Sequence, residues 1–241
     1  MKKLKKIIIV IACVVSLSLI GTGIYVSDYY RAVDIEKYMT NGNGVKISEI
    51  KEGYLFDGPS EENALIFYPG AKVEETAYAP MLRELAERGV DCFLIKMPFH
   101  LAVISPNKAQ RITEEYSYKS YYLAGHSLGG AMIADFPARN GNSWAGLFLL
   151  AAYPSKALTK ADFPIIFIYG ENDGVLKRDK LEKGFSLVPD GYEKLIIKGG
   201  NHANFASYGK QKGDGEASIS GEEQQKITTD IILETIGNQK E

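Results

Sequence analysis

The sequence is poor in cysteine and has no surplus of positive charge, and both absences exclude classes of protein. The two cysteines are Cys13, in an apolar run, and Cys92, in a strand-like run, so the 241-residue chain has neither a disulfide framework nor a paired-cysteine metal motif. Lys and Arg number 28 against 30 Asp and Glu, which leaves no basic excess for binding a phosphate backbone. We therefore expect no nucleic-acid partner, no metal and no cofactor.

The N-terminal segment, residues 1–26, differs from the rest because lysines precede a long apolar run. Residues 7–26 are twenty residues without a charge, about the length that spans a bilayer as a helix. We predict an uncleaved, single-pass anchor in the cell membrane, with the rest of the chain outside the cytoplasm. A cleaved signal peptide, which would make the protein secreted, and a lipoprotein signal ending at Cys13 are the alternatives. The lysines are Lys2, Lys3, Lys5 and Lys6.

Residues 27–44 are polar and aromatic and end in Asn-Gly-Asn-Gly, which indicates a tether and a turn before a domain at residues 45–241. Two short extended runs in residues 45–56, split at Gly53, predict a hairpin. Apolar strand-like runs then alternate with helical segments. We expect strands at residues 64–68, 90–97, 121–124, 144–150, 164–169 and 193–198, a helical stretch that ends with residues 81–89, and helices at residues 105–116, 128–139, 177–184 and 220–236.

The alternation predicts a doubly wound α/β fold. Strands that are apolar throughout and separated by helices are typical of a mostly parallel sheet that is covered on both faces. In such a sheet the ligand crevice lies outside the carboxyl ends of the strands. The loops that follow the strands should therefore carry the function.

One of these loops contains Gly-His-Ser-Leu-Gly-Gly at residues 125–130, between a predicted strand and a predicted helix. A turn from strand to helix around a single residue strains that residue and requires small neighbours two positions away on each side. Gly125 and Gly129 meet this requirement. The motif therefore predicts that Ser127 is a nucleophile held at the edge of the sheet.

A serine hydroxyl needs a base, and the base needs an orienting acid. His202 follows the last predicted strand in a glycine-rich loop and is the candidate base. His126 lies inside the turn and is expected to pack or hydrogen-bond, whereas His100 is expected to line the pocket. Asp173, which precedes Gly174, is the favoured acid, and Glu171 is the alternative in the same loop. Asp190 and Asp135 are less well placed, one in a connecting loop and one within a helix.

Backbone amides should stabilise the oxyanion that forms when the serine attacks. Leu128 would donate from the start of the helix after the nucleophile. The second donor should lie in Pro69-Gly70-Ala71-Lys72, where Gly70 allows close approach of the backbone and the amide of Ala71 or Lys72 could donate. We therefore predict Leu128, Gly70 and Ala71 as the oxyanion residues.

From residue 45 to residue 236 the chain resembles the α/β-hydrolase superfamily, in particular small bacterial serine hydrolases similar to dienelactone hydrolases and carboxylesterases. The motifs that carry the resemblance are FYPG at residues 67–70, GHSLGG at 125–130, YGENDGV at 169–175 and GGNHANF at 199–205. The resemblance implies a triad of Ser127, Asp173 and His202 and acyl-enzyme chemistry on an ester-like bond. The chain departs from the usual pattern in having Pro69 before Gly70, and it lacks the cysteine nucleophile of dienelactone hydrolases.

Many members of the superfamily carry a helical lid between the strands predicted here at residues 144–150 and 164–169. Only thirteen residues, 151–163, separate these strands, so we expect no lid domain and an open site. The candidate apolar walls are Phe99, Leu101, Tyr153 and Phe205, with His100 beside them.

The expected function is that of a membrane-anchored carboxylesterase acting on a small-molecule or envelope-associated ester. The same triad would also serve an acyltransferase or a peptidase. A binding or scaffolding protein that has the fold but has lost catalysis is the alternative outside the enzymes.

Overall fold

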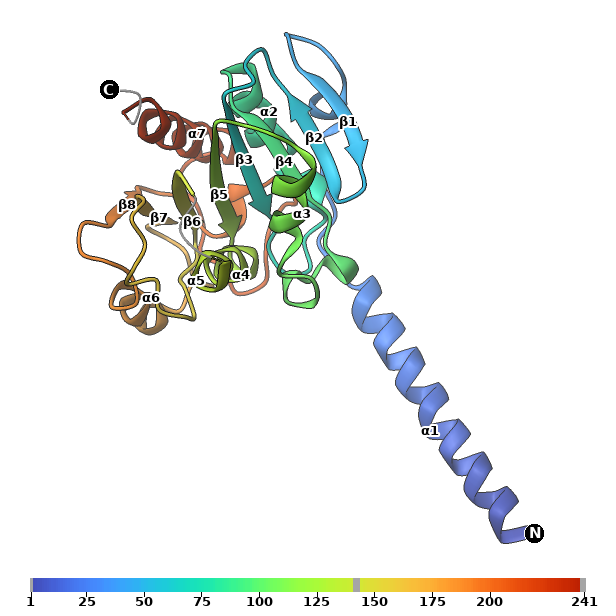
Figure 1. The fold of residues 1–241 in the computed structure, drawn as a ribbon. Helices are drawn as coiled ribbons and strands as arrows, with labels where there is room; N and C mark the ends of the chain where they lie inside the picture. Colours follow the sequence, from blue (N-terminus) through green and yellow to red (C-terminus); the bar gives the residue numbers. More distant parts are fainter. Residues whose placement is uncertain (1, 141–143, 239–241) are drawn as a thin grey trace.

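The computed structural model describes residues 2–140 and 144–238, which form one eight-stranded sheet with helices on both faces and an N-terminal helix that projects from it (Figure 1). The strand order is β1-β2-β4-β3-β5-β6-β7-β8. The strands are β1 (Lys46–Ile50), β2 (Gly53–Asp57), β3 (Asn63–Tyr68), β4 (Asp91–Ile95), β5 (Ser120–His126), β6 (Gly146–Leu150), β7 (Ile165–Gly170) and β8 (Glu193–Ile197). The helices are α1 (Lys2–Ser27), α2 (Ala79–Glu87), α3 (Lys108–Glu115), α4 (Leu128–Ala134), α5 (Pro137–Asn140), α6 (Arg178–Phe185) and α7 (Gly221–Asn238).

The sheet is mostly parallel, which confirms the predicted α/β class. Strands β1 and β2 form the expected hairpin, and β2 pairs antiparallel with β4. The other six strands, which follow the order β4-β3-β5-β6-β7-β8 in the sheet, are parallel to one another. The chain runs from β3 outward to β4 and then returns across β3 to β5, so the strand order reverses there. In such sheets the crevice at the reversal binds the ligand, and here it lies between the loops after β3 and β5.

Alternating side chains of the strands bury both faces of the sheet. Leu65 and Phe67 of β3 face one core, which α2 and α7 cover, whereas Ala64, Ile66 and Tyr68 face the other, which α3, α4 and α6 cover. All six residues of β3 are buried. This explains why the central strands are apolar at every position.

Two predicted helices differ from the observed ones. The helix predicted over residues 128–139 is divided into α4 and α5, because Pro137 has no amide hydrogen and its ring cannot continue an α-helix. The helix predicted from Ser105 begins only at Lys108. There the buried hydroxyl of Tyr68 accepts the amide of Ala109 at 2.7 Å and donates to the carbonyl of Pro106 at 2.9 Å, in place of a cap from Ser105.

The final helix begins as the sequence predicts. The side-chain oxygen of Ser220 accepts the amide of Glu223 at 3.1 Å, which satisfies one of the free amides at the start of α7. Between β6 and β7, residues 151–164 contain no helix, in agreement with the absence of a lid there.

Residues 27–44, which the sequence predicts to be a tether, form ordered contacts with the domain. Tyr30 forms a parallel bridge with Val73, donates its amide to Lys72 at 2.7 Å and accepts the amide of Glu74 at 2.8 Å. Further along, the guanidinium of Arg83 donates to the carbonyls of Thr40 and Gly42. These contacts fix the exit of α1 relative to the loop after β3.

Helix α1 is 26 residues long and carries an uncharged apolar run, and the most apolar stretch of it contains no buried residue. At 1.5 Å per residue it is about 39 Å long, which exceeds the roughly 30 Å hydrocarbon core of a bilayer. Its length and composition suit a membrane span, and N-terminal signal sequences share these properties.

Candidate active site

The turn from β5 to α4 places Ser127 in a strained backbone conformation. Its φ is 51° and its ψ is −122°, a conformation that non-glycine residues rarely adopt. The amide of Ser127 donates to Leu150 at 2.9 Å, and its carbonyl accepts the amide of Ala131 at 3.1 Å, so both neighbouring strand and helix hold the strained residue. Ser127 itself is only half-buried, so its hydroxyl is accessible.

Two glycines allow this turn because no side chain fits at their positions. A Cβ on Gly125 would lie 2.7 Å from the amide nitrogen of Gly130. A Cβ on Gly129 would lie 2.2 Å from the carbonyl oxygen of Pro69. The glycine spacing predicted from the sequence therefore has a steric cause in the packing of α4 against β5 and the loop after β3.

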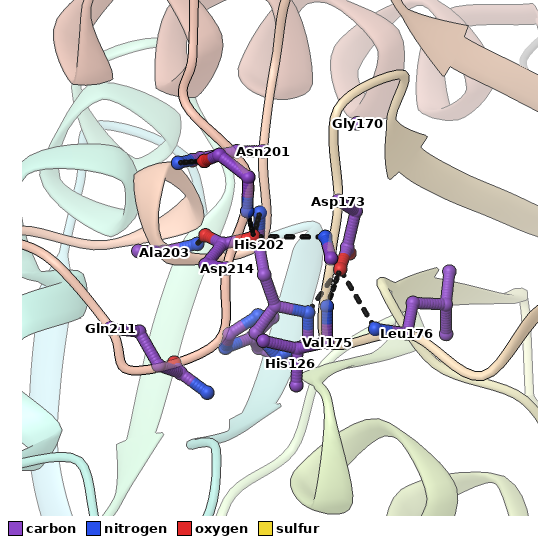
Figure 2. Close-up of polar contacts among 12 residues, drawn as sticks. His126, Gly170, Asp173, Val175, Leu176, Asn201, His202, Ala203, Gln211 and Asp214 are labelled. Atoms are coloured by element: carbon purple, nitrogen blue, oxygen red, sulfur yellow. Dashed lines mark hydrogen bonds and ion pairs between the residues drawn. The ribbon is translucent and has the colours of Figure 1, made fainter.

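His202 and Asp173 meet in the way that the sequence predicts for a base and its orienting acid. His202 follows β8, Asp173 follows β7, and both are buried. The Nδ1 of His202 lies 2.9 Å from Oδ2 of Asp173 (Figure 2). Because an ionised carboxylate only accepts hydrogen bonds, Nδ1 carries the proton and leaves Nε2 free to act as a base.

The second oxygen of Asp173 is held by the backbone. Oδ1 accepts the amides of Val175 at 2.9 Å and Leu176 at 2.8 Å. These two bonds fix the orientation of the carboxylate, so that Oδ2 points at the imidazole (Figure 2).

The other carboxylates considered from the sequence have different partners. Glu171 accepts the amide of Gly199 at 3.0 Å and so ties the ends of β7 and β8 together. Asp135 accepts the hydroxyl of Ser155 at 2.7 Å. Asp190 is exposed.

A cavity of about 230 Å³ lies beside the serine, and both Ser127 and His202 form part of its wall. Most of the remaining wall is apolar, with one cation, Lys177, at the start of α6. The lining residues are Ser127, Leu128, Ala131, Ala151, Ala152, Tyr153, Val175, Leu176, Lys177 and His202. The small side chains in this wall come from α4 and from the loop after β6.

Three predicted pocket residues lie elsewhere. Phe99 is 57% exposed and points away from the core. His100 stacks on Tyr29 with ring centroids 4.1 Å apart, and Phe205 is buried against His126. Of the four candidate apolar walls, the cavity includes Tyr153. Phe99, Leu101 and Phe205 lie outside the wall of this cavity, because position after a strand does not fix the direction of a side chain in an irregular loop.

The loop after β3 contains two amides that already have acceptors. The amide of Gly70 donates to the hydroxyl of Tyr78 at 2.9 Å, so Gly70, predicted among the oxyanion residues for the close approach of its backbone, offers no free amide. The amide of Lys72 donates to the carbonyl of His100 at 2.8 Å. In the described part of the chain, the amides of Ala71 and Leu128 have no acceptor. Of these two free amides, that of Leu128 belongs to a residue in the wall of the cavity beside Ser127.

His126 lies beneath the site. It packs and forms a hydrogen bond there, as the sequence predicts. Its Nδ1 is 2.8 Å from the hydroxyl of Tyr78, and its ring centroid is 4.5 Å from that of His202. Burial, followed by the proximity of His202, holds the pKa of His126 well below its usual range. His126 is therefore neutral, accepts the proton of Tyr78 at Nδ1, and Tyr78 in turn accepts the amide of Gly70.

Asp214 is a site residue that the sequence analysis missed. Its Oδ2 accepts the amide of Ala203 at 2.8 Å, and its Oδ1 accepts those of His202 at 3.2 Å and Gly174 at 3.1 Å (Figure 2). Asp214 thus holds the loop of the base against the loop of the acid. The signal in the sequence that could have found it is its place between Gly213 and Gly215.

No group of three or more potential ligands that could hold a metal ion occurs within residues 2–140 and 144–238. The side chains at the site are a hydroxyl, an imidazole and a carboxylate that already accepts hydrogen bonds from two amides and the imidazole. This donor set suits nucleophilic acyl transfer.

Comparison with known proteins agrees with the geometry. The model of the alpha/beta hydrolase family matches residues 64–226. No curated protein sequence matches the chain.

Solved structures share the fold at low sequence identity. A bacterial membrane phospholipase A, described as a virulence factor, has a TM-score of 0.61 and 13% identity, with 98% of this chain and 99% of that chain covered. TT1662 from Thermus thermophilus has a TM-score of 0.58 and 14% identity over 79% and 98% of the two chains. A ferulic acid esterase from Streptomyces cinnamoneus has a TM-score of 0.55 and 15% identity over 73% and 66%. At these identities the likeness shows the fold alone.

Proposed function

The chain belongs to the alpha/beta hydrolase family, and we propose that it is a serine hydrolase that cleaves an ester-like bond through an acyl-enzyme on Ser127. The observation that carries the proposal is the shared cavity. Ser127 and His202 line it together, while Asp173 holds the imidazole from behind at 2.9 Å. Three groups from three separate loops therefore converge at the carboxyl edge of the sheet.

The proposed reaction follows from the proton positions. His202 takes the hydroxyl proton at Nε2 as Ser127 Oγ attacks the acyl carbon. The amides of Leu128 and Ala71 donate to the oxyanion of the tetrahedral intermediate. When the intermediate collapses, the carbon–oxygen bond to the alcohol breaks and the alcohol leaves with the proton from His202. Water, deprotonated by the same imidazole, then attacks the acyl-enzyme and releases the acid and the serine.

The shape of the cavity favours a short acyl group. A volume of about 230 Å³ is below the roughly 300–1,000 Å³ of typical small-molecule sites, and small alanine side chains form part of its wall. The ferulic acid esterase and the phospholipase A show that the same fold serves ester hydrolysis in other proteins. A small-molecule ester or an envelope-associated ester with a short acyl group is the substrate class that we propose.

We also propose that α1 anchors the protein in the cell membrane by a single span, with the catalytic domain outside the cytoplasm. The lysines before the apolar run favour a cytoplasmic N-terminus. The likeness to the membrane phospholipase A extends over 98% of this chain, so it includes α1. Cleavage of this segment as a signal peptide would give the same catalytic domain in secreted form.

The proposal is tested by replacing the nucleophile. We expect Ser127→Ala to lower kcat on p-nitrophenyl acetate by about 10⁴-fold or more and to abolish labelling by a fluorophosphonate probe. Ser186→Ala is the matched control, because the Ser186 hydroxyl only donates to the carbonyl of Lys183 at the end of α6. A wild-type chain that neither reacts with the probe nor hydrolyses esters would instead be a binding or scaffolding protein. Labelling without hydrolysis would point to acyl transfer or peptide cleavage.

A further inference from the structure

The loop after β4 exposes apolar side chains close to the point where α1 leaves the domain. Outside α1, the described part of the chain has five large hydrophobic residues that are at least about half exposed, and three of them lie within residues 99–104. Phe99 is 57% exposed, Val103 55% and Ile104 50%. Single exposed apolar side chains are ordinary, whereas a cluster of them on one loop indicates contact with a partner.

The backbone of this loop is strained. Phe99 and His100 both have φ of 55°, a left-handed conformation that is rare for bulky side chains. Such strain persists only where surrounding contacts maintain it. Here the carbonyl of His100 accepts the amide of Lys72, and the His100 ring stacks on Tyr29.

These contacts join the loop to the last turn of α1. Lys72, whose amide bonds to His100, forms an ion pair with Asp28 at 2.7 Å and lies over the Tyr25 ring at 4.5 Å. Tyr25 and Tyr29 flank the end of α1 at Ser27, and tyrosines are enriched where a membrane helix leaves the hydrocarbon. The exposed side chains of residues 99–104 are therefore held near the level at which α1 would leave a bilayer.

The same loop lies beside the catalytic machinery. Its short helical turn at Ala102–Ile104 packs against α4, the helix that begins after Ser127. Figure 1 shows α1 projecting from the end of the domain at which β3 and β5 terminate, which is the end that carries the site.

We infer that the 99–104 loop docks into the surface of the bilayer that α1 enters, and that it holds the active-site edge of the sheet against that membrane. The inference rests on the proposed role of α1 as an anchor. The occupant of the apolar surface is lipid, because the ordered contacts at residues 25–30 hold the loop beside the membrane span. The substrate of the site is then an ester presented at the membrane surface.

The first test measures contact with lipid and needs no catalysis. The chain has a single tryptophan, Trp144, so Trp144→Phe gives a background without this fluorophore. Val103→Trp is introduced there in the full chain, which is reconstituted into vesicles of phosphatidylcholine brominated in the upper acyl chain. Ile196→Trp is the matched control, because Ile196 is also 55% exposed but lies on the edge strand β8, which four strands separate from β4.

We expect the brominated lipid to quench the fluorescence of the Val103→Trp chain several-fold and that of the Ile196→Trp chain only slightly. Equal quenching of the two variants, or none of Val103→Trp in a chain that floats with the vesicles, would overturn the docking inference alone. A chain that stays in the soluble fraction would overturn the anchor and the docking together. Neither result would bear on the serine chemistry, which the fluorophosphonate probe tests separately.

A second test links the loop to substrate presentation. The double variant Val103→Ser with Ile104→Ser should hydrolyse a vesicle-embedded ester several-fold more slowly than the wild type and p-nitrophenyl acetate at the same rate. Ile196→Ser should leave both rates unchanged. Equal loss on both substrates would assign the loop to the integrity of the site and would overturn the inference.

Discussion

At the scale of single residues, the orientation of His202 depends on one carboxylate. Asp173 holds Nδ1–H through Oδ2 and is itself held through Oδ1 by the amides of Val175 and Leu176. In Asp173→Asn the amide oxygen would keep the two backbone bonds, so the new NH₂ group would face the imidazole. Nδ1 would then have to accept, and the proton would move to Nε2, where it blocks the base.

We therefore expect Asp173→Asn to lower kcat by about 10⁴-fold while KM changes little. The check is steady-state hydrolysis of p-nitrophenyl acetate at pH 7. Asp190→Asn, at an exposed carboxylate, is the control and should be neutral. A nearly active Asp173→Asn enzyme would mean that another group orients His202.

A second residue-scale prediction concerns the pH dependence of stability. Burial holds the pKa of His126 below its usual range. As the pH falls through about 6.5, this imidazole therefore binds a proton in the unfolded chain but stays neutral in the folded chain. This contribution to the free energy of unfolding is complete above about pH 6.5 and is lost as the pH falls, by at most about 1.4 kcal/mol per pH unit.

His126→Asn removes the titrating ring and leaves a polar group in place of Nδ1 near Tyr78. We expect its denaturation midpoint, measured in detergent between about pH 5 and pH 7.5, to fall less steeply toward acid than that of the wild type. The variant will have a lower stability at pH 7.5, so the slope is the quantity to compare. Parallel slopes would show that other groups cause the acid sensitivity.

At the scale of elements, α4 lies in close contact with the loop after β3. A Cβ at position 129 would meet two backbone oxygens, those of Tyr68 at 2.3 Å and Pro69 at 2.2 Å, and neither can move without displacing β3. We expect Gly129→Ala to lower the free energy of unfolding by about 1–3 kcal/mol or more, and to reduce kcat because it separates Leu128 from Ala71. Gly237→Ala in α7, where a Cβ would meet nothing within 4 Å, is the control. The measurements are denaturant midpoints and kcat, and a Gly129→Ala enzyme equal to wild type in both would contradict the steric account.

The loops that carry the base and the acid depend on Asp214. Its carboxylate accepts amides from His202, Ala203 and Gly174, so its removal leaves these amides without their acceptor. We expect Asp214→Ala to lower kcat by about 10- to 100-fold, because a misplacement of about 1 Å at a site can cost that much. Asp214→Asn, which keeps one acceptor oxygen, should restore part of the rate. Fluorophosphonate labelling of Ser127 should be fastest in the wild type, slower in Asp214→Asn and slowest in Asp214→Ala. Equal rates for the three proteins would show that Asp214 does not position the site.

Much of the element pattern could be predicted from the sequence, because the strands are apolar runs bounded by turn residues. The division of α4 from α5 was also signalled, by Pro137 within a predicted helix. The sequence did not indicate that Tyr68 holds the start of α3 or that Asp214 joins two loops. Each depends on atoms that meet only after distant segments pack, as when Asp214 contacts residues eleven to forty positions away. The direction of the Phe99 side chain likewise follows from the left-handed backbone conformation of this residue, which no sequence pattern predicted.

At the scale of the whole molecule, one edge of the sheet gathers both the site and the exit of α1. The loop after β3 takes part in both, because Ala71 is a proposed oxyanion donor while Lys72, the next residue, pairs with Asp28 beyond α1. Under these proposals, adjacent residues of one loop connect the membrane anchor with an oxyanion donor. The proposed function requires that the site lies on the side of the membrane where its substrate is found, so the proposed orientation of α1 is the property to test.

The positive charges before the apolar run predict that orientation, and cysteine labelling can check it. Burial raises the pKa of the Cys92 thiol and hides it from reagents, so Cys13→Ala gives a chain without a reactive thiol. In that background we expect Lys51→Cys, in the exposed turn between β1 and β2, to react with a membrane-impermeant maleimide on intact protoplasts. Lys3→Cys should react only after permeabilisation, because three lysines still favour retention of its end in the cytoplasm. The opposite pattern would place the catalytic domain in the cytoplasm, and a labelled chain found in the medium without residues 1–26 would show that the segment is a cleaved signal.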